Sequence, residues 1–349
     1  MAKLKYILRA LKSLRIKNML KVAKKLAKKT HKLTLFILID MIYCGFKYGA
    51  GYYDYQEFEF YNLNSAERKT YLTRGKNNEI VKKFNDKSSF YKFENKIVFN
   101  KIFDKFDNKE EFNKLFKKYL KRDYLVIDEN SFKKFENFIK KHNPIIVKPI
   151  NGSGGKGVEK YEIDEDSNIK ALFNTLLIRK QLLIEECIIQ HQEINKLYSD
   201  SINSLRLFTF FDGDNTYVLN SVFKIGNGGV TDNFSSGSMY TFVNDEGIII
   251  CPAIDQDDNY YEVHPITKEK ILGFKIPDYD KACKLVIEAS KVVKEVKYIG
   301  WDVAITPSGP VIIEGNSYPG VFQMKPSFSK NHLGLIPIYE KYMDIDLKK

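Results

Sequence analysis

A lysine followed by a glycine-rich loop is the feature of this sequence that points most directly to chemistry. The stretch VKPINGSGGKGV covers residues 147–158, and Lys148 ends a short apolar run that begins at Pro144. We expect this run to be a buried strand and residues 159–163 to form a second strand. A glycine loop of this kind brings backbone N–H groups onto phosphate oxygens, and Lys148 would add positive charge at the same place.

Two common kinds of phosphate-binding loop are excluded by the residues that come after the glycines. Gly152, Gly154 and Gly157 formally match the dinucleotide fingerprint, but that fingerprint requires a helix to begin at the loop. Here the chain continues as VEKYEI and an acidic turn. A P-loop needs Gly-Lys-Ser/Thr, whereas Lys156 is followed by glycine. The sequence therefore predicts a flexible loop between two antiparallel strands, with an ordinary glycine-rich hairpin as the alternative.

Oxygen-bearing side chains cluster in a second stretch, GWDVAITPSGPVIIEGN, at residues 300–316. Two apolar runs in it have the pattern of strands joined by a turn over 307–310. Pairing across the turn places Asp302 close to opposite Glu314, and Asn316 lies on the same side two residues further on. Two carboxylates and an amide oxygen are hard ligands that suit Mg²⁺. We expect the opposite face of the hairpin to be a core face made by Val303, Ile305, Val311 and Ile313.

The elements that must position these residues are a mixture of helices and strands. Residues 96–140 have a mostly helical pattern. The elements expected after them are a helix near 168–180, strands around 182–188, 205–212, 216–224 and 237–250, a helix over 279–296 and a hairpin over 300–315. The predicted class is α/β (α+β), with mostly antiparallel pieces in the second half.

The net charge of +12 belongs to the N-terminal part of the chain. Residues 1–33 hold twelve of the 56 Lys and Arg residues and no Asp or Glu, so the rest carries 44 charges of each sign. This distribution argues against a body that binds nucleic acid. Within residues 4–27 the apolar residues recur at helical spacing, which predicts a basic amphipathic helix, or two. We expect it to dock on the chain's own body or to lie on the anionic inner face of a membrane, with RNA or another acidic partner as a further alternative.

The sequence predicts a cytoplasmic protein. The apolar run 33–43 is too short to span a bilayer and is interrupted by Asp40, and no signal peptide with a cleavage site is evident. Cysteines are few, and none has CxxC spacing. They are expected to be reduced thiols and not zinc ligands: Cys44, Cys187, Cys251 and Cys283.

Four stretches together resemble the ATP-grasp superfamily, and more closely its sugar-transfer-associated branch. They are IVKPINGSGGKGV, LLIEECIIQHQEINKLYSDSINSLRLFT, GGVTDNFSSGSMY and IGWDVAITPSGPVIIEGN, in the order of the family. The resemblance implies an ATP-grasp fold with ATP between a central lid and a larger C-terminal domain. The expected boundaries are 1–45 for a basic helical extension, 46–140 for an N-terminal domain, 141–188 for the lid and 189–349 for the C-terminal domain.

The resemblance also implies roles for individual residues. Lys148 and Lys96 would bind ATP, with Lys101 as a rival for Lys96. Arg206 would steady the transferred phosphoryl group, while Asp232 and Asn233 would line the phosphate and acceptor site. The magnesium ligands would be Asp302, Glu314 and Asn316. The remaining nucleotide contacts would come from the glycine loop, from the hinge that meets adenine, and from a ribose-binding glutamate with His191 or Gln192 as alternatives: Ser153, Gly154, Gly155, Glu185, Glu186, Cys187, Ile188 and Glu193.

Members of this superfamily typically use Mg-ATP to join a carboxylate to an amine through an acyl phosphate. The resemblance thus implies an ADP-forming carboxylate–amine ligase with ATP and Mg²⁺ as cofactors. Its substrates would be a sugar or lipid-linked glycan carboxylate and an amine donor, in capsule or other cell-surface polysaccharide biosynthesis. Two alternatives stay open: a sugar or glycan kinase on the same fold, with a base such as Asp232, and a nucleotide-binding scaffold without turnover.

Overall fold

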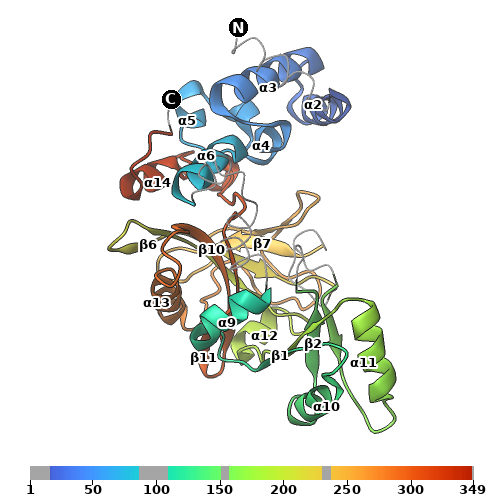
Figure 1. Cartoon of the computed structure of the whole chain (residues 1–349). Coiled ribbons are helices and arrows are strands. Elements are labelled where there is room, and N and C mark those ends of the chain that lie inside the picture. The colour runs from blue at the N-terminus through green and yellow to red at the C-terminus, as the bar shows by residue number, and fades with distance from the viewer. Residues whose placement is uncertain (1–15, 86–108, 151–156, 230–236, 348–349) are drawn as a thin grey trace. The chain divides into compact units, whose positions relative to one another are not determined.

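The computed structural model describes residues 16–85, 109–150, 157–229 and 237–347 (Figure 1). The chain divides into two compact units. One, the helical unit, combines Met1–Ile80 with Gly320–Lys349, and the other, the sheet unit, is Val81–Pro319. These units do not follow the boundaries expected at residues 45, 140 and 188, which stay a prediction.

The helical unit begins with a pair of helices whose sequence pattern explains their packing. In α2 (Ile16–Thr30) the buried residues are Met19, Ala23 and Leu26, three to four positions apart, as one face of a helix requires. The amphipathic helix expected from the sequence is confirmed here, while residues 4–14 lie outside the described residues. The other elements are α3 (Thr34–Tyr48), α4 (Tyr52–Glu57), η1 (Phe60–Asn62), α5 (Ser65–Arg68), α6 (Arg74–Phe84, which ends in the sheet unit), η3 (Pro326–Phe328) and α14 (Ile336–Tyr342).

The helix α3 contains residues 34–43 of the apolar run, which is too short to span a bilayer. Gly49 ends it in the left-handed conformation with φ 65°, and its N–H bonds back to the carbonyl of Cys44. Among the helices that the structure describes, none has both the length and the apolar character that crossing a membrane requires.

The sheet unit contains a small antiparallel sheet of four strands in the order β1-β4-β2-β3. Two helices, α10 (Phe132–Lys141) and α11 (Ile169–Ile178), share a core with it. Phe135 and Phe173 from the helices join Ile145, Val147 and Ile184 from the strands in that core. The strands are β1 (Tyr124–Val126), β2 (Ile145–Lys148), β3 (Glu159–Tyr161) and β4 (Leu183–Glu186).

The larger sheet has seven antiparallel strands in the order β11-β10-β5-β6-β7-β8-β9. Three helices pack on it: α9 (Lys109–Leu120), α12 (Gln192–Leu197) and α13 (Tyr279–Ala289), seen around the lower part of Figure 1. The fully buried Trp301 lies against Phe116 of α9 and donates its Nε1–H to Thr209 over 2.9 Å. The strands are β5 (Leu205–Phe211), β6 (Thr216–Ile225), β7 (Met239–Phe242), β8 (Ala253–Ile254), β9 (Tyr260–Tyr261), β10 (Tyr298–Thr306) and β11 (Gly309–Asn316).

These sheets confirm the mixed α/β class and the antiparallel second half. One detail of the hairpin β10–β11 corrects the sequence prediction. Asp302 pairs with Glu314 and Val303 pairs with Ile312, so Ile313 is the extra residue of a β-bulge. Val303 and Ile305 lie in the core as expected, but the residue of β11 that joins them in that core is Ile312. The expectation that Val311 and Ile313 share that face was wrong, because strict alternation does not hold across the bulge.

Candidate active site

Lys148 and Glu185 form a buried ion pair at the end of the small sheet. The strands β2 and β4 are antiparallel neighbours in which Ile146 opposes Glu185, so the side chains of Lys148 and Glu185 point to the same face. The Nζ of Lys148 lies 2.5 Å from the Oε2 of Glu185. Lys148 is 8% exposed and Glu185 is 3% exposed. Lys148 therefore ends its strand as predicted, and Glu185, expected to contact the nucleotide, binds Lys148 through its side chain.

Glu185 has two further partners that sequence reasoning missed. Asn113 donates to its Oε1 over 2.7 Å, and the guanidinium of Arg122 lies 3.2 Å from the same oxygen. Burial alone would raise the pKa of Glu185, but Arg122 and Lys148 outweigh it and lower the pKa to about 2. Arg122 also donates to the carbonyls of Ile312 and Ile313 over 2.6 and 3.1 Å. The ionised carboxylate of Glu185 is thereby connected to the bulge of the hairpin.

The glycine loop lies between β2 and β3, which pair antiparallel as predicted. A dinucleotide-binding turn needs a helix that begins at the loop, but among the described residues after the loop the first helix is α11, which begins only at Ile169. At the end of the loop, Gly157 has φ 73° and its carbonyl accepts from Nε2 of Gln181 over 2.9 Å. Ser153, Gly154 and Gly155 lie outside the described residues.

Asp302 stands at the centre of a second buried cluster on the large sheet. Arg206 of β5 binds it through both Nε and a terminal nitrogen, and the second of these bonds measures 2.7 Å. Lys224 of β6 lies 2.9 Å from the same carboxylate. All three residues are buried. Burial alone would raise the pKa of Asp302, but the adjacent Arg206 and Lys224 hold the pKa well below its usual range.

The other two expected metal ligands lie on the neighbouring strand with matching register. Glu314 pairs directly with Asp302, and Asn316 pairs with Gly300, so their side chains share one face of the hairpin. Asn316 donates to the carbonyl of Gly300 over 3.3 Å, which leaves its amide oxygen able to accept or coordinate. Glu314 is half-buried. Two carboxylates and an amide oxygen on adjacent pairs fit the donor set that Mg²⁺ takes.

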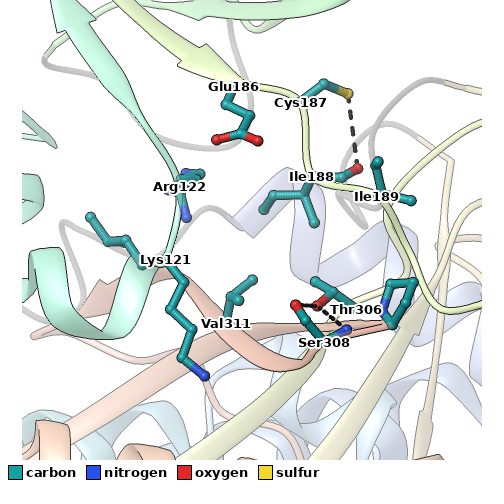
Figure 2. A pocket seen from close by; sticks show the side chains of 11 residues that line it. Lys121, Arg122, Glu186, Cys187, Ile188, Ile189, Thr306, Ser308 and Val311 are labelled. Carbon is teal, nitrogen blue, oxygen red and sulfur yellow. Dashed lines mark hydrogen bonds between the residues drawn. The ribbon is translucent and has the colours of Figure 1, made fainter. Parts of the chain in front are cut away.

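The hinge between β4 and α12 (residues 187–191) borders a pocket of about 270 Å³. Glu186, Cys187 and Ile188 line one wall of this pocket and Thr306 to Ser308 of the hairpin turn line another (Figure 2). Lys121 and Arg122 complete it. Neither Lys148 nor Asp302 lines this pocket, whereas Arg122, which also contacts Glu185, does, so the pocket adjoins the hinge and touches the Glu185 cluster only through Arg122.

Glu193, expected to bind ribose, is exposed and forms an ion pair of 2.7 Å with Lys196. His191 is the N-cap residue of α12, and its Nδ1 accepts from the N–H of Glu193 over 3.2 Å. His191 therefore has a capping role in this structure, whereas Gln192 is exposed. Three further residues with expected roles at the phosphate and acceptor site lie outside the described residues, together with the rival Lys101: Lys96, Asp232 and Asn233.

Lys224, Arg122 and Asn113 are the site residues that sequence reasoning missed. Lys224 stands within the run LNSVFKI of a buried strand, and a lysine that interrupts such a run is a signal that could have identified it. Arg122 and Asn113 had no comparable signal. Asn113 lies on an amphipathic helix, and Arg122 follows a basic stretch typical of a solvated surface.

Comparison with known protein families identifies the family of this chain. The model of the sugar-transfer-associated ATP-grasp family matches residues 75–330, which is more than half of the chain. The chain therefore belongs to the sugar-transfer-associated ATP-grasp family. No curated protein matches the sequence.

Solved structures similar to this chain include ATP-grasp enzymes at low identity. The D-alanine–D-alanine ligase of Coxiella burnetii has a TM-score of 0.41 at 10% identity, covering 70% of this chain and 58% of that one. A D-alanine–D-alanine ligase of Bacillus anthracis, complexed with ATP, has a TM-score of 0.39 at 16% identity, with 69% and 62% covered. The N5-carboxyaminoimidazole ribonucleotide synthetase of Thermotoga maritima has a TM-score of 0.36 at 11% identity, with 61% and 42% covered. The chain thus spans less than two thirds of each structure, and these similarities are too low to assign it any of their activities.

Proposed function

We propose that the chain is an ADP-forming carboxylate–amine ligase that uses Mg-ATP to modify a sugar or glycan in cell-surface polysaccharide biosynthesis. The observation that carries the proposal is a set of buried cations, each held by a buried carboxylate. Lys148 is held by Glu185, and Arg206 and Lys224 are held by Asp302. Burying such charges is costly and seldom stabilises a fold more than apolar residues would, so we infer that these cations serve to bind phosphate.

In this proposal ATP binds between the small and the large sheet. Lys148 neutralises phosphate charge from the small sheet, while Arg206 and Lys224 do so from the large one. Asp302, Glu314 and Asn316 would hold magnesium, which when bound withdraws negative charge from the phosphate oxygens. Because Asp302 is already ionised, it needs to lose no proton to bind a cation. Its change of partner would make Arg206 and Lys224 available to phosphate.

The chemistry asks for positioning and charge neutralisation more than for covalent help from the protein. A substrate carboxylate oxygen attacks the γ-phosphorus, the bond to the ADP oxygen breaks, and an acyl phosphate forms. An amine nitrogen then attacks the acyl carbon, inorganic phosphate leaves, and the amine releases a proton to solvent. Arg206 and Lys224 stabilise the charge that develops on the transferred group. The loop between β2 and β3 would keep water from the acyl phosphate.

The sugar or glycan substrate is inferred from the family to which the chain belongs, whose description associates it with sugar transfer. A uronic acid, free or within a glycan, offers the carboxylate that the reaction consumes. An amino acid or amino sugar offers the amine.

The first test is a calorimetric titration of Mg-ATP into the wild-type chain and a Glu314→Ala variant. Glu246→Ala is a matched control, since that glutamate is exposed on a turn of the same unit. We expect magnesium-dependent binding that Glu314→Ala loses and Glu246→Ala keeps. Equal binding by all three proteins would contradict the metal assignment.

The reaction is then tested by supplying uronic acids with amines and measuring ADP, inorganic phosphate and product mass. A ligase releases ADP and inorganic phosphate in equal amounts and forms an amide. ADP without inorganic phosphate, with a phosphorylated glycan, would replace the ligase by a kinase. Binding of Mg-ATP without any turnover across the substrates would favour the scaffold.

A further inference from the structure

The helix α3 of the helical unit is apolar on two opposite faces. One face is buried in the unit and consists of Ile37, Met41, Cys44 and Tyr48. The opposite face also carries apolar residues at helical spacing, but each of these residues is 46–64% exposed to solvent. It forms a stripe of five large residues, which we call the α3 stripe: Leu35, Phe36, Ile39, Tyr43 and Phe46.

Such a stripe is unusual for a helix that already buries one face. A surface helix normally turns polar side chains to solvent, and a helix that is apolar all round is normally covered. The side chains of the stripe are also contiguous, at i, i+3 and i+4 positions, and contiguous exposed apolar surface marks an interaction site. We therefore infer that the stripe binds a partner that offers an apolar environment.

The charge around the stripe narrows the choice of partner. Residues 16–48 contain eight lysines, and Lys32 and Lys47 lie at the two ends of the stripe. The neighbouring helix α2, which packs against α3, supplies the other six lysines: Lys17, Lys21, Lys24, Lys25, Lys28 and Lys29.

The single acid in this segment does not offset that charge. Asp40 is bound by both terminal nitrogens of Arg68, over 2.8 and 2.7 Å, and accepts from the hydroxyl of Tyr55 over 2.7 Å. The pair α2–α3 is thus a helical hairpin with an exposed apolar stripe and a strong positive charge.

We propose that the α3 stripe and the lysines of α2 dock the chain on an anionic lipid surface. The apolar side chains would enter the boundary between headgroups and acyl chains, and the lysines would bind the anionic headgroups. A second copy of the chain would fit the stripe less well, because its eight lysines would face the same charge. A polyanion such as nucleic acid would use the lysines but not the stripe. The inference goes beyond the proposed ligase activity and does not depend on it.

The proposal is tested by sedimenting the full chain with vesicles of phosphatidylcholine alone and with mixed phosphatidylcholine–phosphatidylglycerol vesicles. We expect binding to the mixed vesicles, little binding to the neutral ones, and a loss of binding as salt is raised. Phe46→Ser should lower the partition coefficient about tenfold, since a buried phenyl ring is lost. Lys21→Gln should lower it about fivefold.

The matched control is Ile178→Ser, which removes an 82% exposed apolar side chain from α11 of the sheet unit and should not change binding. Each replaced side chain is exposed, so unchanged thermal unfolding should verify that the variants fold. Residues 1–15 are present in every variant. Equal binding by the wild type and Phe46→Ser would therefore assign lipid binding to those residues and overturn the role of the stripe.

Two other results would also overturn the proposal. Absence of wild-type binding to the mixed vesicles would mean that something else covers the stripe, such as residues 1–15. A wild-type dimer in analytical ultracentrifugation that Phe46→Ser converts to a monomer, without lipid binding by either protein, would assign the stripe to self-association.

Discussion

Arg206 holds both carboxylate oxygens of Asp302 across the neighbouring strands β5 and β10. The pair is buried, and the adjacent Lys224 gives this one carboxylate two cationic partners. Asp302 thus neutralises two buried cations of the large sheet. It is at the same time the first of the three predicted magnesium ligands. The structural and the chemical roles of this residue can be separated by comparing it with Glu314.

Replacing Asp302 should damage both the fold and the site. Asp302→Asn removes the buried carboxylate charge that Arg206 and Lys224 share, which should lower the free energy of unfolding by about 3–5 kcal/mol. Glu314→Gln should change stability much less, because no described residue forms an ion pair with Glu314. Urea unfolding measures the difference, and both variants should lose magnesium-dependent nucleotide binding. Similar stability of the two variants would show that the Asp302 cluster does not hold the sheet together.

Lys224 should matter for nucleotide binding more than for folding. In Lys224→Met the carboxylate of Asp302 keeps Arg206 as a partner, while one cation near the proposed phosphate site is lost. We expect the affinity for Mg-ATP to fall about tenfold or more, as for loss of a charged hydrogen bond. Calorimetry measures the change, and Lys270→Met, which replaces an exposed lysine of the same unit, serves as the control. An unchanged affinity would limit Lys224 to neutralising Asp302.

The ion pair of Glu185 should make stability depend on acid pH. The pKa of Glu185 is lowered to about 2 in the folded chain, below its unfolded value. Its contribution is therefore fully present above the unfolded pKa and is lost as pH falls through the folded pKa. The difference corresponds to about 3 kcal/mol, lost between about pH 4.5 and pH 2.

Urea unfolding at several pH values tests this expectation with Glu185→Gln. The variant should be less stable than the wild type at neutral pH, and the gap should narrow as the solution is acidified. A gap that stays constant with pH would mean that the glutamine costs stability through packing and not through charge.

Gly226 at the end of β6 should not tolerate a side chain. A Cβ at this position would collide with the Oγ of Ser201 and lie 2.5 Å from Cδ1 of the buried Tyr198. Gly226→Ala should cost about 1–3 kcal/mol of unfolding free energy, as overpacking does. At Gly229 no atom of the described residues lies within 4 Å of such a Cβ, so Gly229→Ala should stay within about 0.5 kcal/mol of wild type. Thermal or urea unfolding of the two variants measures this difference in stability. Equal stability of the two variants would mean that Ser201 and Tyr198 move aside to make room for the Cβ.

Much of the sheet unit could be predicted because its signals are local. Lys148 ends β2 and α11 follows the acidic turn, as the sequence indicated. The hairpin β10–β11 was also predicted, although its turn is Pro307 and Ser308 and not the expected 307–310, because Gly309 and Pro310 already pair with β10. The apolar periodicity predicted a helix over 279–296, which is too long at its C-terminal end. Val293 and Val296 continue the apolar spacing of α13 into the core, although the helix itself ends at Ala289.

The rest depends on partners that are distant in sequence. Glu185 lies 37 positions from Lys148, 63 from Arg122 and 72 from Asn113 in the sequence. No local sequence pattern specifies contacts at such separations. Asp302 was recognised as a ligand from its spacing to Glu314, but its neutralisation by Arg206 and Lys224 follows from strand order, which the sequence does not state.

The extra residue at Ile313 decides which side chains of β11 face the core and which face the site. Ile312, before the bulge, belongs to the core, and Glu314, after it, lies beside Asp302. Ile312 and Glu314 are two residues apart and would face the same side of a regular strand, but the bulge places them on opposite sides. Deleting Ile313 would keep Ile312 opposite Val303 and Glu314 opposite Asp302, because adjacent residues of a regular strand face opposite sides. This strand should therefore tolerate loss of Ile313 better than β10 tolerates loss of a residue, since β10 pairs with a strand on each side.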